Sequence, residues 1–365
     1  MIELDGNYGE GGGALVRVAL ALSALTGKEF HVANIRAGRK DAGLKAQHVT
    51  AIKALKKICQ AETNEIQLGS TELYFKPGKT KAGRYEFDIG TAGSISLFLQ
   101  AVLLPCLFAP DKVTLTVIGG TSGKWASSVD YLQHVLRPQL SRFVENIELQ
   151  ILQRGYYPQG GGKVEMKVKP KYSCSEFSTV AEFNSQIQSA ITPIIFDHQS
   201  RLEQIQGVVN VSQQLREKRV AERIKVNAEA LLRKYQVPIT LRTEYALSSS
   251  IGGEIVLWAS FKEPGKIAAN QVILGADELV EKGKTSEQIG KEAAGKLIRE
   301  IDSQAAVDIH AEDQLIPVMA LLPGSSIIVR QVSKHALTNI YVSEKFLPVR
   351  FEVEKRRIMV LPTSA

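Results

Sequence analysis

The sequence predicts a mixed α/β protein in which strand and helix units of similar size repeat and a smaller α/β domain is inserted near the end. Over the first 170 residues, Gly-rich turns repeatedly join a strand-like run to an apolar helical run. Those turns disappear between about 180 and 275, and the first pattern returns afterwards. A chain of 365 residues also exceeds what one core usually supports, so at least two packed units are expected.

The first part of the chain opens with a helix pattern. Leu15, Val18, Leu22 and Leu25 fall on one helical face, and Gly27 provides a stop. The runs that follow alternate between the strand and helix periods. They predict strands over 28–38, 72–78 and 112–120, helices over 44–60 and 129–143, a strand, a glycine turn and a helix over 85–108, and a hairpin over 147–170.

The inserted domain is expected over 180–275, which leaves 1–179 and 276–365 for the body. A long helix near 216–235 has a basic face opposite an apolar one. The apolar face consists of Val220, Ile224, Leu231 and Tyr235. After the insert, the sequence predicts helices over 286–301 and 308–324 and strands over 325–332 and 349–357.

Composition narrows the class of protein. The chain has 45 Lys and Arg against 38 Asp and Glu, an excess that suits a nucleic acid or nucleotide partner but is also common in ordinary soluble proteins. Cys59, Cys106 and Cys174 are few and odd in number, which fits neither a disulfide framework nor a zinc module. Without a signal-peptide pattern or an apolar run of membrane length, we expect a soluble, cytoplasmic protein with no membrane association.

The segment GNYGEGGG, residues 6–13, precedes the first predicted helix. Backbone N–H groups at such a start favour an anion, and a tight turn is the alternative, because neither common phosphate-binding fingerprint fits. Glu10 is harder to explain as part of a turn. Backbone amides that favour a phosphate would place it beside the Glu10 carboxylate. That arrangement makes sense mainly if a divalent cation lies between the phosphate and the carboxylate.

The strongest electrostatic feature is the basic segment 36–57. A solvated helix face explains its lysines, but Arg36 and Arg39 in a Gly-containing loop favour phosphate binding. Gln47 and His48 begin the following helix, near its positive end. His48 also lies on the apolar stripe, so a core histidine is an equally good interpretation.

Two further segments leave alternatives open. RGYYPQGGGK, residues 154–163, favours a hairpin with a wide glycine turn. The segment at 308–314 places polar side chains in and just before a helix start, where they cap the helix or hold a purine, a ribose or a metal. These side chains are Asp308, His310, Glu312, Asp313 and Gln314.

His335 follows the strand-like run 325–332 as an expected loop residue. A neutral imidazole is a nucleophile or base near pH 7, and no G-x-S-x-G motif accompanies it to indicate an acyl-transfer triad. The position of His335 alone favours a structural role over a catalytic one. Thr338 is the expected cap of the next helix.

Taken together, these segments resemble the RNA 3'-terminal phosphate cyclase family over nearly the whole chain. The residues that carry the resemblance are DGNYGEGGGALVRVALALSALTG, IRAGRKDAGLKAQH, GTAGS with Gln100, RGYYPQGGGKV, AEDQLIPVMAL and HALTNI. The resemblance implies a body of repeated βαβαββ units, similar to the enolpyruvyl transferase fold, with a smaller inserted α/β domain. The signature string at 154–162 and His335 do not support the activity of an enolpyruvyl transferase itself.

The implied reaction converts an RNA 3'-terminal phosphate to a 2',3'-cyclic phosphodiester with ATP, through covalent histidine-AMP and RNA-adenylate intermediates. The resemblance implies His335 as the nucleophile and Glu10 as the residue associated with Mg²⁺ or Mn²⁺. The family's ATP-site positions match Gln100, His310, Ala311, Glu312, Asp313 and Gln314, and its phosphate positions match Arg17, Arg39, Gln47 and His48. The alternative is a non-catalytic RNA-binding factor of ribosome assembly with the same fold, a branch that lacks the histidine.

Overall fold

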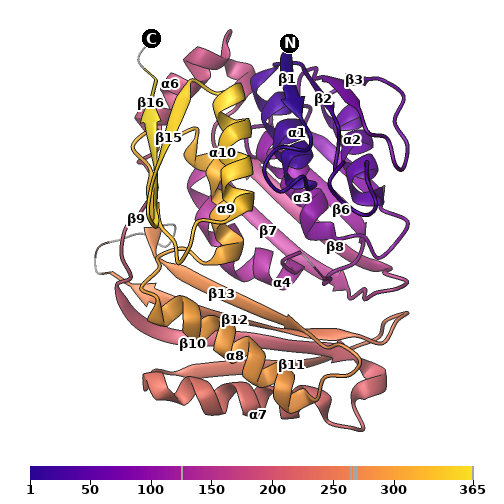
Figure 1. Cartoon of the computed structure of the whole chain (residues 1–365), viewed down its shortest axis with the longest axis vertical. Helices are drawn as coiled ribbons and strands as arrows, with labels where there is room; N and C mark the ends of the chain where they lie inside the picture. Colours follow the sequence, from indigo (N-terminus) through magenta and orange to yellow (C-terminus); the bar gives the residue numbers. More distant parts are fainter. Residues whose placement is uncertain (125, 264, 266–269, 364–365) are drawn as a thin grey trace.

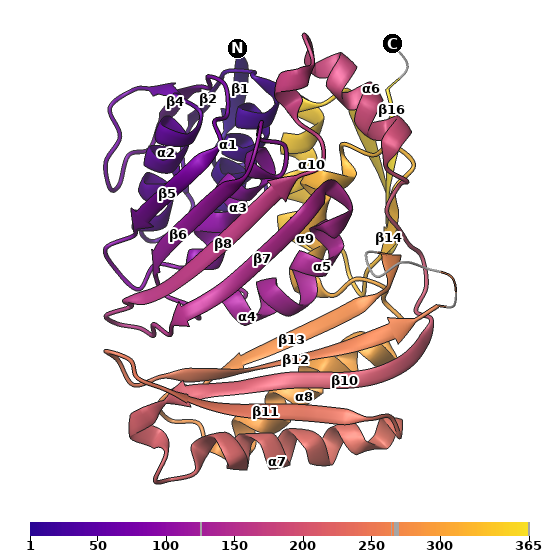
Figure 2. The same ribbon diagram turned by 180° about the vertical axis from the view of Figure 1, so that it is seen from behind.

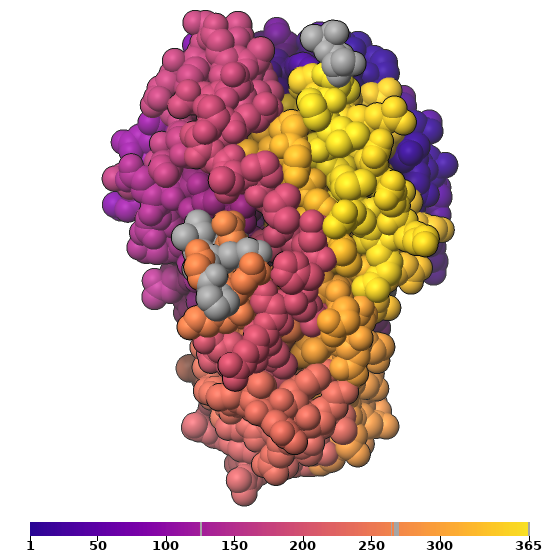
Figure 3. Space-filling view, turned by 90° about the vertical axis from the view of Figure 1, so that its left-hand side faces the viewer, coloured from indigo at the N-terminus to yellow at the C-terminus, as the bar shows by residue number. Residues whose placement is uncertain are grey.

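The computed structural model describes residues 1–124, 126–263, 265 and 270–363, and it consists of a body with a smaller layer beneath it (Figure 1). The lower layer is the insert. In the space-filling view it forms the lower lobe of the molecule (Figure 3). Over the described residues, no helix is both long and apolar enough to cross a membrane.

The body contains three units with the same order of elements, βαβαββ. In each sheet the first two strands pair in parallel, and the fourth strand lies between the second and the third with antiparallel neighbours. A parallel pair requires a crossover, which a helix provides in each unit. The repeated units expected from the sequence are therefore confirmed.

The first two units follow one another along the chain, and their β-strands and helices lie in the upper part of Figure 2. The first unit contains β1 (Ile2–Asp5), α1 (Ala14–Thr26), β2 (Phe30–Ala33), α2 (Ala46–Ile58), β3 (Glu62–Thr63) and β4 (Leu73–Lys76). The second contains β5 (Gly83–Asp88), α3 (Ile95–Leu107), β6 (Val113–Gly119), the helical turns from α4 (Val129–Tyr131) to α5 (Arg137–Leu140), β7 (Val144–Gln153) and β8 (Gly162–Pro170).

The third unit is interrupted by the insert. After α6 (Val180–Ala190) it begins with β9 (Ile195–Phe196), and it resumes with α9 (Ile309–Met319), β14 (Ser326–Ile328), α10 (Lys334–Phe346), β15 (Val349–Glu354) and β16 (Arg357–Pro362). The expected single strand over 349–357 is instead a hairpin. Lys355 has a φ of 53°, the left-handed conformation of a tight turn, and the chain reverses there.

The insert is a four-stranded sheet with two helices on one face. It contains β10 (Arg201–Ser212), α7 (Val220–Leu232), β11 (Ile239–Ala246), β12 (Gly253–Lys262), β13 (Ile273–Leu279) and α8 (Ser286–Asp302), with the strand order β11-β10-β12-β13. Leu231, expected on the buried face of α7, is exposed, and Leu232 is buried instead. The domain limits 180 and 275 stay a prediction; by topology, α6 and β9 lie with the body, and β13 and α8 with the insert.

Helix α1 is the centre of the body and packs against α3 and α10. All of its residues are buried, so burial extends beyond the one apolar face that the sequence predicted. Because α10 belongs to the third unit, this packing brings the glycine-rich segment before α1 close to His335. Arg17, in the first turns of α1, is buried with the helix.

Candidate active site

His335 lies in the first turn of α10 and not in a loop. The cap is Ser333, whose hydroxyl accepts a hydrogen bond from the Ala336 amide at 3.0 Å. The expectation of Thr338 as the cap was therefore wrong. Its hydroxyl bonds back to the Lys334 carbonyl at 2.9 Å, and it packs against Gly9, where a Cβ would lie 2.5 Å from that hydroxyl oxygen.

Glu10 holds His335 from the opposite element. His335 Nδ1 donates to Glu10 Oε1 at 2.8 Å, and Arg39 Nη2 donates to Glu10 Oε2 at 3.1 Å. The Glu10 hydrogen bond raises the pKa of His335 above its ordinary value, against the effect of burial. Burial alone would raise the pKa of Glu10, but His335, Arg39 and Arg17 outweigh it and lower that pKa. Glu10 is therefore a carboxylate with a hydrogen-bond donor on each oxygen, His335 on one and Arg39 on the other.

The glycines beside Glu10 make room for these side chains. A Cβ at Gly12 would lie 2.1 Å from Glu10 Oε1, and a Cβ at Gly13 would lie 2.3 Å from His48 Nε2. Gly9 and Gly11 adopt positive φ angles of 66° and 58°, which bend the segment around the carboxylate. The glycine run is thus explained by the close packing of Glu10, Arg39 and His48 against it.

Arg17 and His48 lie on the other side of that segment. Arg17 Nε donates to Gln100 Oε1 at 3.0 Å, and burial lowers the pKa of Arg17 to about 10, which leaves it charged. His48 is 1% exposed, and burial together with nearby cations lowers its pKa to about 3. His48 Nδ1 accepts from the Lys45 amide at 3.0 Å, so the proton is on Nε2, which has no partner among the described residues. A buried donor beside a buried arginine has the chemistry that an anion requires, and we call Arg17 and His48 the expected anion site.

The start of α9 is capped by Asp308. This carboxylate accepts from the amides of His310 and Ala311, from the Tyr131 hydroxyl at 2.6 Å and from the Gly275 amide at 2.7 Å. Its role is therefore to fix α9 against the body and against β13. The capping interpretation is confirmed for Asp308, whereas the side chains that follow it divide between two sides of the helix.

His310 faces the insert. His310 Nε2 lies 3.5 Å from Asp277 Oδ1 on β13, and although burial opposes it, this carboxylate raises the pKa of His310 to about 9. Glu312 faces the interior, where its Oε1 accepts from the Ser333 amide at 2.9 Å and burial raises its pKa to about 7. Glu312 thereby couples α9 to the cap of the helix that carries His335.

A cavity of about 700 Å³ joins the body to the insert at this point. His335, Arg17, Gln100, His310, Asp313 and Gln314 line it, so six of the residues predicted from sequence share one space. Glu10, Arg39, Gln47, His48, Ala311 and Glu312 are not part of its lining. Its far wall comes from the insert, where Glu278 bonds to both Lys284 and Lys296 at 2.8 Å.

These insert residues have no motif that would have revealed them. Asp277, Lys284 and Lys296 stand in segments that resemble any charged strand end or solvated helix. Only the docking of the insert places them opposite His310.

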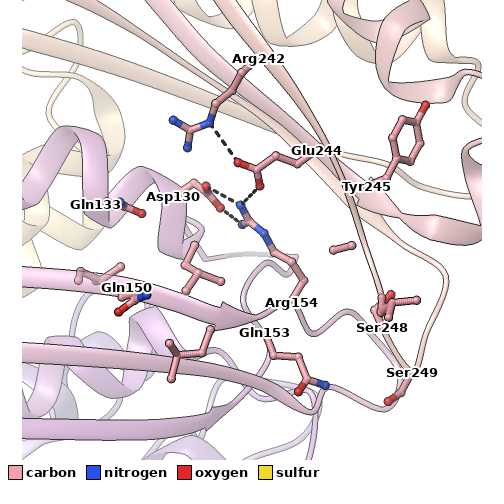
Figure 4. A pocket seen from close by; sticks show the side chains of 15 residues that line it. Asp130, Gln133, Gln150, Gln153, Arg154, Arg242, Glu244, Tyr245, Ser248 and Ser249 are labelled. Carbon is pink, nitrogen blue, oxygen red and sulfur yellow. Dashed lines mark hydrogen bonds and ion pairs between the residues drawn. The ribbon is translucent and has the colours of Figure 1, made fainter.

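The signature segment 154–162 lies where the insert meets the body (Figure 4). The Arg154 guanidinium is buried, pairs with both oxygens of Asp130 and donates to Glu244 of β11 at 2.7 Å. Tyr156 donates its hydroxyl proton to Asn210 of β10 at 2.8 Å. We call Arg154, Asp130, Glu244, Tyr156 and Asn210 the clamp. The expected hairpin is confirmed, and its polar residues fasten the two parts of the molecule together.

A small apolar cluster accompanies the clamp. Tyr131 and Val135 of the body pack against Val208, Val256 and Trp258 on the open face of the insert's sheet. A groove of about 1050 Å³, lined by Arg154, Arg242, Gln150 and Leu247, runs outside this junction. The groove contains none of the residues that surround His335.

The fold and the site define an α/β protein of three βαβαββ units that holds a paired histidine at a polar cavity large enough for a nucleotide. Residues 8–353 match the family described as RNA 3'-terminal phosphate cyclase. The chain belongs to the RNA 3'-terminal phosphate cyclase family.

Named relatives cover the whole length. The chain is 39% identical to the RNA 3'-terminal phosphate cyclase of Methanosarcina mazei over 98% of this chain and 97% of the relative. It is 39% identical to that of Archaeoglobus fulgidus, over 99% and 100%, and 38% identical to that of Nitrosospira multiformis, over 99% and 95%.

Proposed function

We propose that this chain is an ATP-dependent enzyme that cyclises RNA 3'-terminal phosphates through a covalent adenylate on His335. The observation that carries the proposal is the Glu10 and His335 pair at the edge of the cavity. A neutral imidazole whose Nδ1 proton is held by a carboxylate has its Nε2 lone pair available for attack. Arg17 and His310 supply positive charge for a triphosphate, whereas Lys284 and Lys296 on the opposite wall are paired with Glu278.

In the first step Nε2 forms a bond to the α-phosphorus of ATP, the bond to the β-phosphate oxygen breaks, and pyrophosphate leaves. The phosphorylated imidazole is cationic, and Glu10 neutralises it through the Nδ1 proton. An oxygen of the RNA 3'-phosphate then takes the adenylyl group, which restores neutral His335. The adjacent 2'-hydroxyl finally attacks the 3'-phosphorus, loses its proton and expels AMP.

A divalent cation fits the site as a companion of ATP. Among the residues described, no cluster of three or more Asp, Glu, His or Cys forms a preformed metal cage. Mg²⁺ commonly binds through one carboxylate together with substrate phosphates. Glu10, whose lowered pKa keeps it ionised, would be that carboxylate, through the lone pairs that remain beside its His335 and Arg39 partners. When bound, the cation would neutralise phosphate charge.

The test is incubation with ATP labelled at the α-phosphate and Mg²⁺ or Mn²⁺. The wild-type protein should acquire stable label, and His335→Ala should not. A 3'-phosphorylated oligoribonucleotide should then become resistant to phosphatase in the presence of ATP. Equal labelling of both proteins would remove His335 from this role, and an RNA that binds but stays phosphatase-sensitive would favour a non-catalytic assembly factor.

A further inference from the structure

A second cavity, of about 760 Å³, lies directly beside the one that contains His335. The two share a wall made of Leu97, Gly123, Lys124, Leu279 and Glu281. Lys124 of the body and Glu281 of the insert form an ion pair of 3.3 Å within this wall. The two cavities are therefore neighbouring compartments of one junction between the body and the insert.

The second compartment differs chemically from the first. Its outer part carries Tyr157, which is 79% exposed, and Ile251, which is 64% exposed. Such large apolar groups at the mouth of a polar cavity suit the flat face of a base. Gln47 and Lys124 provide hydrogen-bond donors further in. Two lysines and one glutamate, Lys124, Lys282 and Glu281, are the charged residues of the described lining, so the compartment has a positive balance.

Gln47 also connects this compartment to the anion site. It precedes His48 at the start of α2, and its Oε1 lies 3.7 Å from where a Cβ of Gly93 would stand. His48 in turn contacts Gly13 beside Arg17. A phosphate held near Gln47 would thus be next to the residues that surround His335.

We propose that the second compartment holds the 3'-terminal nucleotide of the RNA, with its base against Tyr157 and its phosphate directed past Gly123 toward His335. This proposal rests on the proposed function, because it assigns the acceptor of that reaction. The adenylyl group stays on His335 while the RNA 3'-phosphate attacks its phosphorus, so the RNA end needs a space beside the one that holds AMP. The shared wall supplies that arrangement.

The first test compares RNA binding with the ATP half-reaction. Tyr157→Ala should raise the KM for a 3'-phosphorylated oligoribonucleotide and its Kd by about 10- to 100-fold, the usual effect of losing one base stack. Covalent labelling by ATP should change less than about twofold. Tyr157→Phe should restore RNA affinity, because the ring and not the hydroxyl makes the contact. Leu247→Ala, a side chain 82% exposed in the groove of Figure 4, is the matched control and should change neither quantity.

The second test blocks the passage. A Cβ at Gly123 would meet no atom of the described residues within 4 Å, so Gly123→Leu should fold normally and project into open space. Protein that is already adenylylated should then transfer AMP to RNA at least about tenfold more slowly than wild type, while Gly123→Ala should be near normal.

The outcomes separate the two proposals. An unchanged RNA Kd in Tyr157→Ala, or a loss of RNA affinity in Leu247→Ala instead, would overturn the assignment of the second compartment. Failure of wild-type protein to acquire label would overturn the proposed function, and RNA binding by the Tyr157 variants would still test the compartment.

Discussion

Glu10 Oε1 and His335 Nδ1 lie 2.8 Å apart and join the first βαβαββ unit to the third. The pair exists because α1 and α10 pack side by side in the core. The chemistry of the site therefore depends directly on the packing of repeats.

Glu10→Gln should slow covalent labelling of His335 on the order of 100-fold, because an amide cannot neutralise the imidazolium that forms. The measurement is the initial rate of labelling at saturating ATP. Glu3→Gln is the matched control, since Glu3 pairs with His31 Nδ1 at 2.9 Å on the surface. Similar rates in the two variants would argue against a role for the buried pair.

His48→Leu should separate activity from stability. The substitution removes an unpaired buried donor, Nε2, but also the Nδ1 acceptor of the Lys45 amide, so the free energy of unfolding should fall by no more than about 1–3 kcal/mol. Cyclisation should fall at least about tenfold, because the anion site loses one of its donors. Urea unfolding and RNA cyclisation measure the two quantities. A large loss of stability would make His48 a packing residue.

The His310 and Asp277 pair predicts a pH dependence of stability. The folded pKa of about 9 lies above the ordinary histidine value near 6.5, so the folded state binds this proton more tightly. The contribution is fully present below pH 6.5 and is lost as pH rises through about 9.

Thermal unfolding between pH 6 and about pH 10 tests this dependence. The Tm of wild type should decline across the window, and Asp277→Asn should flatten the decline because it removes the carboxylate that raises the pKa. Parallel curves for the two proteins would rule the pair out as the cause.

Arg154→Met should cost about 3–5 kcal/mol of unfolding free energy, because the buried carboxylate of Asp130 would lose its charged partner. Arg242→Met is the control. Arg242 is half exposed and pairs with the same Glu244 at 3.1 Å, so its loss should cost no more than about 1 kcal/mol. Urea denaturation of both variants compares them directly, and equal losses would contradict a special role for the clamp.

Much of the fold could be predicted because glycine turns and apolar periods are local signals. The buried face of α1 and the hairpin before residue 170 follow from such patterns. The cap of α10 could not be placed in the same way, because Ser333 and Thr338 are both good capping residues.

The contacts among the candidate site residues could not be predicted from the sequence. The family resemblance implied Arg17 and His335 and added to the case for Glu10, whereas only tertiary packing determines that Glu10 contacts His335 and that Arg17 contacts Gln100. The insert's contribution was not predictable. Asp277 is one charged residue among many until β13 is docked against α9.

The clamp has a consequence for recognising relatives. The most conspicuous string of the chain, with Arg154 and Tyr156, fastens the insert to the body and lies outside the cavity of His335. A relative that lacked the proposed nucleophile, His335, would still need this string to hold the insert against the body. Surveys that score the string would therefore group active and inactive descendants together, whereas the residue at position 335 would tell them apart.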